Sequence, residues 1–500
     1  MKKFTSVFVV SVIVSVIFIL WGVVAPGQMA EITSTIQSLI QQKFGWFYLF
    51  SATGFLLFAL WLIFSPLGKL KLGKDSDRPE YGTLSWFAML FSAGMGIGLV
   101  FWGVAEPLSH FHSPPVGDGQ TTEAARMAMR YSFFHWGLHP WGIYSVLALG
   151  LAYFKFRKDA PGLISAVFSP LLKEKVNGPV GKLIDILAVF ATVFGVATSL
   201  GFGAVQISGG LSSLTPLENN FPTQLVIIIV VTALFSLSAV SGIGKGIKYL
   251  SNLNIILAVL LLAFLLFVGP TEFFMSVFSS TLGSYLQNLA GMSLYMAPFA
   301  DQAHEWVNSW TVFYWAWWIS WAPFVGTFIA RISKGRTIRE FVIGVLLVPT
   351  LFGSLWFAVF GGSGLYLELY EGIPLHQIMS DKGIEVLLFS VLEEFPLATL
   401  MTGLAIILIS TFFITSADSA AFVLGMQTTH GSLNPPNSIK LIWGVIIAAS
   451  AAVLLYSGGL QALQTASIIA AFPFTFVLIG VIVSLVRSFR GERDGLMRTG

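Results

Sequence analysis

Runs of about twenty apolar residues recur along the chain and are separated by shorter segments that hold most of the polar and charged residues. A run of this length lets an α-helix cross the hydrocarbon core of a bilayer. Twelve such segments are predicted, over residues 4–24, 46–66, 83–106, 128–154, 184–208, 223–243, 250–269, 307–330, 338–362, 398–425, 439–457 and 463–486. The pattern therefore predicts an all-α polytopic membrane protein with twelve transmembrane helices.

The composition supports this prediction. Of the 500 residues, 55% are hydrophobic and only 10% are charged, against about 25% charged in soluble domains. We expect no nucleic-acid partner. The absence of cysteine rules out disulfides and thiol-ligated metals. The segment 4–24 is predicted to be a retained helix, because it exceeds the usual core of a signal peptide and Pro26 follows the only plausible cleavage position.

The distribution of lysine and arginine predicts the orientation. If both termini are cytoplasmic, the outside segments hold only four of the 27 basic residues, namely Lys43, Arg126, Arg130 and Lys382. This asymmetry is the one that the positive-inside rule requires. We therefore expect a multi-pass protein of the plasma membrane.

The third apolar segment contains glycines at 94, 96 and 98. Each weakens a helix by about 1 kcal/mol relative to alanine, so the stretch predicts either local unwinding, which exposes backbone groups inside the protein, or close helix packing. Glu106, followed by Pro107, stands at the predicted outer end of the same segment. An acid within an apolar segment is a functional candidate, although an exposed gate or a helix-ending contact fits equally well.

Four tryptophans stand within residues 315–321, near the middle of an apolar segment rather than at its ends, where tryptophan usually lies. At 100° per residue, Trp317, Trp318 and Trp321 share one helix face, and Trp315 points elsewhere. In segment 128–154, Trp136 and Tyr144 fall within about 80° of each other, and Pro140 predicts a kink.

The same segment places His135 and His139 four residues apart. This spacing supplies half a metal site, but no third ligand has matching spacing. Packing or a polar contact is therefore favoured.

The tryptophans and the tyrosine of these two segments suit a quaternary ammonium group. Such a group has no N–H to donate and is recognised by aromatic faces through cation–π attraction. Because no carboxylate accompanies the rings, a zwitterion fits better than a simple cation. An aromatic packing cluster is the alternative.

In segment 398–425, the hydroxyls of Thr415 and Ser416 predict either bonds back to the helix backbone or oxygen ligands for a hard cation such as Na⁺. Asp418 has the character of a proton carrier, a structural hydrogen-bonding group or distant charge support for that cation.

Four segments together resemble the betaine/choline/carnitine transporter family: GMGIGLVFWGVAEP (94–107), HWGLHPWGIY (135–144), YWAWWISWAPF (314–324) and TSADSA (415–420). The resemblance covers essentially all twelve predicted helices. It implies a LeuT-type fold of two inverted five-helix repeats, and usually a homotrimer. The implied organisation is N-terminal helices over 1–81, a first repeat over 82–270, a linker helix over 271–304, a second repeat over 305–486 and a short cytoplasmic tail over 487–500.

The resemblance also implies site residues. Those of the aromatic substrate site and its entry pathway are Trp317, Trp318, Trp321, Trp136 and Tyr144, with Gly98 in the glycine stretch, where choline-selective relatives tend to have an acid. The principal sodium site would use Ser92, Met95, Phe412, Thr415 and Ser416. A second sodium site would use Thr192 and Phe324, but Val196 stands where a second threonine is expected, which weakens this prediction.

The function expected is secondary active uptake of a quaternary ammonium osmolyte, most of all glycine betaine, by sodium symport through alternating access. Sodium is the coupling ion, and no other cofactor is expected. The alternatives are proton coupling through Asp418 or Glu106, and uptake of choline, carnitine, ectoine or dimethylsulfoniopropionate. A channel is a further rival. An enzyme is not expected, because the chain shows no paired catalytic acids, no HExxH and no nucleotide-binding loop.

Overall fold

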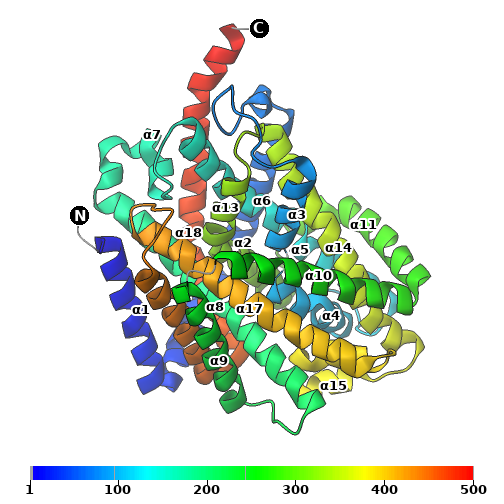
Figure 1. Ribbon diagram of the computed structural model, residues 1–500. Helices are drawn as coiled ribbons and strands as arrows, with labels where there is room; N and C mark the ends of the chain where they lie inside the picture. Colours follow the sequence, from blue (N-terminus) through cyan, green and yellow to red (C-terminus); the bar gives the residue numbers. More distant parts are fainter. Residues whose placement is uncertain (1–3, 95, 242–243, 499–500) are drawn as a thin grey trace.

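The computed structural model describes residues 4–94, 96–241 and 244–498, and its described elements are helices joined by loops. Figure 1 shows long helices crossing at several angles. Their bounds are α1 Ser6–Val24, α2 Pro26–Phe64, α3 Thr83–Gly94, α4 Ile97–His112, α5 Thr122–Trp136, α6 Leu138–Ala152, α7 Ser169–Leu172, α8 Pro179–Leu214, α9 Phe221–Ser241, α10 Gly244–Val268, α11 Thr271–Ser293, α12 Asp301–Val307, α13 Phe313–Ile332, α14 Ile338–Tyr370, α15 Leu375–Lys382, α16 Leu387–Glu393, α17 Ala398–Thr428 and α18 Asn437–Arg498. Short 3₁₀ and π segments lie between several of them.

The first two helices meet at a sharp break. The hydroxyl oxygen of Thr5 caps α1 by accepting from the Phe8 amide. Ala25 leaves the helical conformation (φ −138°, ψ 62°), and Pro26 opens α2, where a missing N–H has no consequence. The start predicted at residue 46 was wrong, because the polar residues after Pro26 are also helical and α2 runs for 39 residues.

The glycine stretch interrupts its helix. Helix α3 ends at Gly94, Gly96 is extended (φ −163°, ψ 179°), and α4 begins at Ile97. Of the two interpretations left open by the sequence, local unwinding is the one observed. Helix α4 then continues through Pro107 to His112, so the predicted helix end at Glu106 was wrong.

The segment 128–154 is also broken, but not where Pro140 predicted. The break is at Gly137 (φ −94°, ψ −132°), between α5 and α6. Pro140 lies in the first turn of α6, where its ring is tolerated. The Tyr285 hydroxyl of α11 accepts from the free Leu138 amide at 3.0 Å and so satisfies the start of α6.

The predicted linker over 271–304 contains helices α11 and α12. Helix α11 packs on α5 and α14, at the edge of the molecule in Figure 1. The last two predicted segments are both contained in α18, with a break at Gly458 and Gly459. Gly459 has φ 60°, a conformation that glycine adopts without strain. The helix continues through the predicted tail to Arg498.

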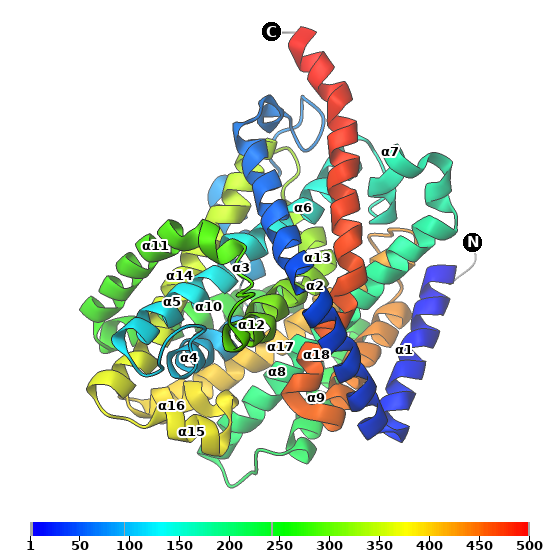
Figure 2. The same ribbon diagram turned by 180° about the vertical axis from the view of Figure 1, so that it is seen from behind.

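Helix α18 is the central packing element. It contacts α8, α2, α13, α1 and α9, and Figure 2 shows α2 lying along it. The first helix of each predicted repeat packs on the second helix of the other, since α4 contacts α14 and α13 contacts α6.

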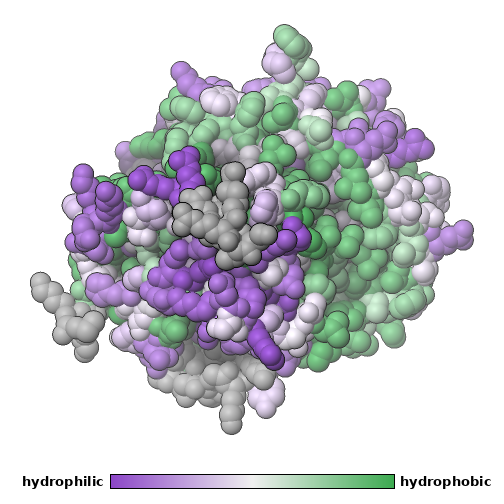
Figure 3. Space-filling model, turned by 90° about the horizontal axis from the view of Figure 1, so that it is seen from above, coloured by the Kyte–Doolittle hydropathy of each residue, from purple (hydrophilic) through white to green (hydrophobic). Residues whose placement is uncertain are grey.

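Seven described helices are long and apolar enough to cross a membrane by length and composition. The predicted segments 83–106 and 128–154 are each divided into two shorter helices, and the count of twelve spans stays a prediction. Large apolar side chains such as Phe64 (83% exposed) and Phe267 (75% exposed) lie on the outer surface, as a lipid-facing protein requires. Figure 3 shows hydrophobic residues along one flank and hydrophilic ones gathered toward the middle of one end.

Candidate functional site

An internal cavity lies beside the break between α3 and α4. Its walls come from both predicted repeats, through α4, α5, α6, α8, α13 and α14. The lining residues are Gly96, Gly98, Leu99, Trp136, Trp141, Tyr144, Ser199, Trp317, Trp318, Trp321, Pro349, Phe352 and Gly353. All six residues predicted for the substrate site therefore lie around one cavity, which we call the aromatic chamber. Their role in binding stays a prediction.

The indole rings of the chamber meet at steep angles. Trp136 is perpendicular to Trp318, with ring centroids 4.8 Å apart, and Tyr144 is perpendicular to Trp318 at 5.9 Å. Trp317 stacks on Trp318 at 5.4 Å. Rings at right angles present faces and edges to one small volume, which is the arrangement that a compact cation needs.

Two further aromatic residues test the helical-wheel argument. Trp315 stacks on His139 at 5.0 Å and packs against Phe134, on a different side from the chamber tryptophans, as the wheel predicts. Trp141 lines the chamber and was missed. Trp141 and Tyr144 stand three residues apart in α6, with ring centroids 5.4 Å apart, so their spacing on one helix face was the signal that could have found Trp141.

The absence of a side chain at Gly98 leaves room for the indole rings of the chamber. A Cβ atom at this position would lie 2.4 Å from Cη2 of Trp317 and 3.2 Å from Cη2 of Trp136. Any side chain here would displace the indoles, so the absence of an acid at Gly98 follows from packing as well as from charge.

A second cavity adjoins the chamber at Trp321, which lines both. Four of the five residues predicted for the principal sodium site line it: Ser92, Phe412, Thr415 and Ser416. Met95 lies outside the described residues. Thr415 donates its hydroxyl proton to the backbone oxygens of its own helix, Thr411 O at 3.0 Å and Phe412 O at 3.2 Å. Asn254 of α10 donates to the same hydroxyl at 3.0 Å.

The residues predicted for a second sodium site lie as follows. Thr192 is buried in α8 and donates to Ala188 O at 2.8 Å. Val196 is buried one turn later and offers no oxygen ligand from its side chain. Phe324 lines the second cavity and also a third.

A third cavity, wider than the first two, adjoins the second. It shares Ser251, Phe324, Phe328 and Ser419 with the second. The three cavities measure about 40, 130 and 380 Å³ in order from the aromatic chamber. The widest is lined by Lys155, Arg331 and Lys440, together with Asp418. The three cavities thus lie in a row, sharing lining residues, from the aromatic chamber to these basic residues.

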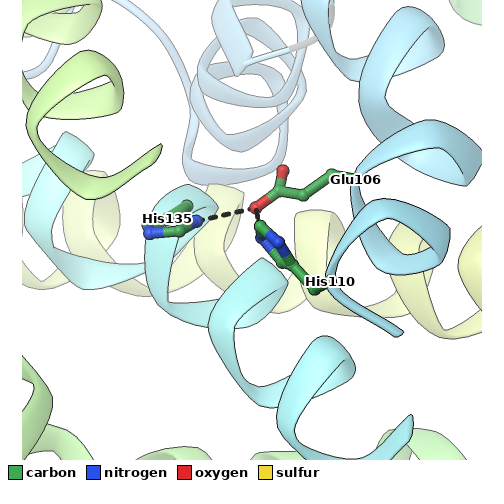
Figure 4. Close-up of side chains that lie close together, drawn as sticks. All are labelled: Glu106, His110 and His135. Carbon is green, nitrogen blue, oxygen red and sulfur yellow. Dashed lines mark hydrogen bonds and ion pairs between the residues drawn. The ribbon is translucent and has the colours of Figure 1, made fainter. Parts of the chain in front are cut away.

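On its other side the chamber adjoins a buried polar network. The carboxylate of Glu106 in α4 is fully buried and accepts four hydrogen bonds. His135 Nδ1 at 2.7 Å and His110 Nε2 at 3.2 Å contact Oε1, and Figure 4 shows both imidazoles pointing at this oxygen. Trp136 Nε1 at 2.7 Å and the Tyr314 hydroxyl donate to Oε2. Glu106 is therefore not an exposed gate.

The same three side chains have potential metal-ligand atoms within 4.8 Å of one another. Because each oxygen of the carboxylate already receives two donors, the carboxylate is satisfied without an ion. The pairing of His135 with His139 as half a metal site is not observed, since His139 stacks on Trp315 instead.

The described residues form long apolar helices around an internal chamber, an arrangement typical of membrane transporters. The sequence model of the BCCT, betaine/carnitine/choline family transporter, matches residues 6–494. The chain belongs to this family.

Several curated relatives match along nearly the whole chain. It is 56% identical to the "Glycine betaine transporter OpuD" of Bacillus subtilis, over 99% of this chain and 96% of that protein. It is 44% identical to the "Probable glycine betaine transporter" of Desulfitobacterium hafniense, over 98% of both. It is 42% identical to the "Ectoine/hydroxyectoine transporter" of Virgibacillus pantothenticus, over 97% of both.

Proposed function

We propose that this transporter takes up glycine betaine by sodium symport through alternating access. The aromatic chamber carries the proposal. Trp136, Trp318 and Tyr144 meet nearly at right angles around it, and among its described lining residues none is acidic. A trimethylammonium group binds aromatic faces with about 2 kcal/mol or more per desolvated contact, and the missing acid favours a zwitterion over choline.

The carboxylate end of the substrate also finds donors. The Tyr144 hydroxyl and the Trp317 indole N–H are buried, line the chamber and have no hydrogen-bond partner among the described residues. A buried donor without a partner costs about 1–3 kcal/mol, so a ligand that accepts from these groups is favoured. The α4 N-terminus, which begins at Ile97 after the break, supplies further free amides beside Gly98.

The second cavity supports the coupling ion. Hydroxyls of Ser92, Thr415 and Ser416 line it, and Na⁺ prefers oxygen ligands, as hard cations do. It joins α3 to α17 next to the helix break, so an ion bound there would hold the unwound stretch in place. Sodium then raises substrate affinity, and the substrate raises sodium affinity by the same factor.

The row of cavities supports a state that is open toward one end. The basic residues at this end, such as Lys155 and Arg331, make it the cytoplasmic end under the positive-inside rule, with both termini inside. Rocking of α3–α6 and α13–α14 against the remaining helices would close this path and open the opposite one. The contacts of α4 with α14 and of α13 with α6 support two inverted five-helix repeats. A homotrimer follows from the family resemblance.

Uptake of ectoine is the second candidate, because one relative is named for it. Proteoliposomes loaded with potassium buffer and diluted into sodium or potassium buffer at fixed pH test both the substrate and the coupling ion. We expect saturable uptake of labelled glycine betaine that requires sodium outside, and weak competition by choline. Undiminished uptake without sodium would overturn sodium coupling, and stronger competition by ectoine than by betaine would overturn the substrate.

A further inference from the structure

Glu106 lies directly behind one wall of the aromatic chamber. Its Oε2 atom accepts from the indole N–H of Trp136 at 2.7 Å, and the ring of Trp136 lines the chamber. The carboxylate is thus one indole away from the space that the quaternary ammonium group would occupy.

The same carboxylate also contacts His135, whose backbone bonds a second chamber residue, Trp318. His135 donates from Nδ1 to Glu106, and its backbone oxygen accepts from the Trp318 indole N–H at 2.9 Å. Trp136 and Trp318 are the two rings that meet at 4.8 Å and 85°. Glu106 therefore contacts Trp136 directly, whereas Trp318 bonds only the backbone of His135 and not its imidazole.

The network joins elements from both predicted repeats. Glu106 and His110 come from α4, His135 and Trp136 from α5, and Tyr314 from α13. His135 Nε2 also contacts the Thr311 hydroxyl at 2.9 Å. Of these residues, only Trp136 lines the chamber. The carboxylate therefore acts on the chamber through the Trp136 ring.

A carboxylate in this position has an electrostatic effect as well as a positional one. An anion that accepts from an indole N–H polarises the ring and increases the negative charge on its face, which strengthens cation–π attraction. Burial strengthens the effect, because interactions between charges are screened less inside a protein than in water.

We propose that Glu106 is the charge-selecting and positioning residue of the aromatic chamber, acting through Trp136 to favour ligands with a quaternary cation. The proposal rests on the proposed function. It assigns the negative charge of the site to a residue that the substrate does not touch, which explains how a chamber without an acidic lining residue recognises a cation.

The test compares glycine betaine with 3,3-dimethylbutanoate, which has the same shape but carbon in place of the charged nitrogen. In proteoliposomes, Glu106→Gln should raise the KM for betaine about tenfold and change the inhibition constant of 3,3-dimethylbutanoate, which lacks the positive charge, less than twofold. Equal losses for both ligands would show a merely structural role and overturn the proposal, as would unchanged values for both. Glu368→Gln, which alters a carboxylate paired with His112 outside the chamber, is the matched control.

Two further variants keep the test decisive. Glu106→Asp retains the charge with a shorter reach, so the ratio of the two affinities should stay at its wild-type value even where both fall. A fall in this ratio of affinities would contradict the proposal. The comparison does not depend on Glu106→Gln, so it can be made even if that variant does not insert into the membrane. In Trp136→Phe, adding Glu106→Gln should have little further effect on betaine, whereas additive losses would show that Glu106 does not act through Trp136. Absence of saturable betaine uptake in the wild type would refute the proposed function itself.

Discussion

At the scale of single residues, the chamber depends on which face of α13 each tryptophan occupies. Trp321 is the ring that separates the aromatic chamber from the second cavity. Its indole N–H donates to Gly195 O at 2.7 Å, which fixes the ring against α8. This residue therefore belongs to the walls of both cavities, and its role in substrate binding is a prediction.

Trp321→Leu should raise the KM for glycine betaine between about tenfold and thirtyfold, because loss of one cation–π contact removes about 2 kcal/mol. Uptake kinetics in proteoliposomes give the measurement. The control is Trp61→Leu, since Trp61 is 49% exposed on the outer surface and is expected to leave KM unchanged. An unchanged KM in Trp321→Leu would count against the aromatic site.

Gly98→Ala tests the steric origin of the chamber. The added Cβ would lie 2.4 Å from Trp317, so the ring must move, and we expect betaine uptake to fall at least about tenfold while the protein still inserts. Gly54→Ala in α2, where nothing lies within 4 Å of the added atom, should transport normally. Equal activity of the two variants would show that the close approach is not needed.

At the scale of helices, the two breaks at Gly96 and Gly137 decide the site. The break at Gly96 lies beside Gly98, and the break at Gly137 lies between Trp136 and the pair Trp141 and Tyr144. A pattern of apolar residues places a helix in the membrane but does not report where its backbone leaves the helical path, because hydropathy is the same on both sides of a break. The glycine spacing at 94–98 offered the first break as one of two interpretations, whereas the expected kink at Pro140 did not locate the break at Gly137.

The end of α18 is held against two loops by ion pairs. Glu492 accepts two bonds from Arg157, at 2.9 and 3.0 Å, and one from Lys158 at 2.8 Å. Both carboxylate and guanidinium are largely buried, with side-chain exposures of 12% and 13%. Arg157 also bonds Asp75 at 2.8 Å, so the loop before α3 is part of the same contact.

Glu492→Gln should loosen the end of α18, because a bidentate contact to arginine becomes a neutral one. We expect the midpoint of thermal unfolding in detergent to fall by about 2 °C, and trypsin to cut after Arg487 and Arg490 sooner. Glu393→Gln, at an exposed position, serves as the control. A tail cut at the wild-type rate would show that the ion pairs do not hold it.

At the scale of the whole molecule, the series of cavities predicts access from one side. The chain has no cysteine, so a single introduced thiol reports its own surroundings. Ser419 lines the second and third cavities. Ser419→Cys should react with a membrane-impermeant maleimide applied from the cytoplasmic face and much more slowly from outside.

Sodium together with glycine betaine should slow this reaction if binding shifts the protein away from the inward-open state. Ser363→Cys, which is fully buried in α14, should stay unlabelled. Faster labelling of Ser419→Cys from the outside would contradict both the direction of the path and the orientation of the chain.

The sequence by itself determined the features that follow from local patterns. Apolar run length predicted the long helices, and a 100° rotation per residue separated Trp315 from the three chamber tryptophans. The glycine spacing offered an interruption near Gly96 as one of two interpretations. Family motifs pointed to residues that the fold brings around two adjoining cavities, and the transporter class follows from the same motifs.

Only the tertiary structure decided the relations between distant segments. It shows that Trp141 lines the chamber and that Trp317 leaves no room for a side chain at Gly98. It also shows that Glu106 is a buried acceptor of four hydrogen bonds rather than a helix end. These facts depend on how α4, α5 and α13 pack, and they include a contact between residues 208 positions apart. Periodicity describes one helix at a time, so it cannot report which donors another helix brings to a buried carboxylate.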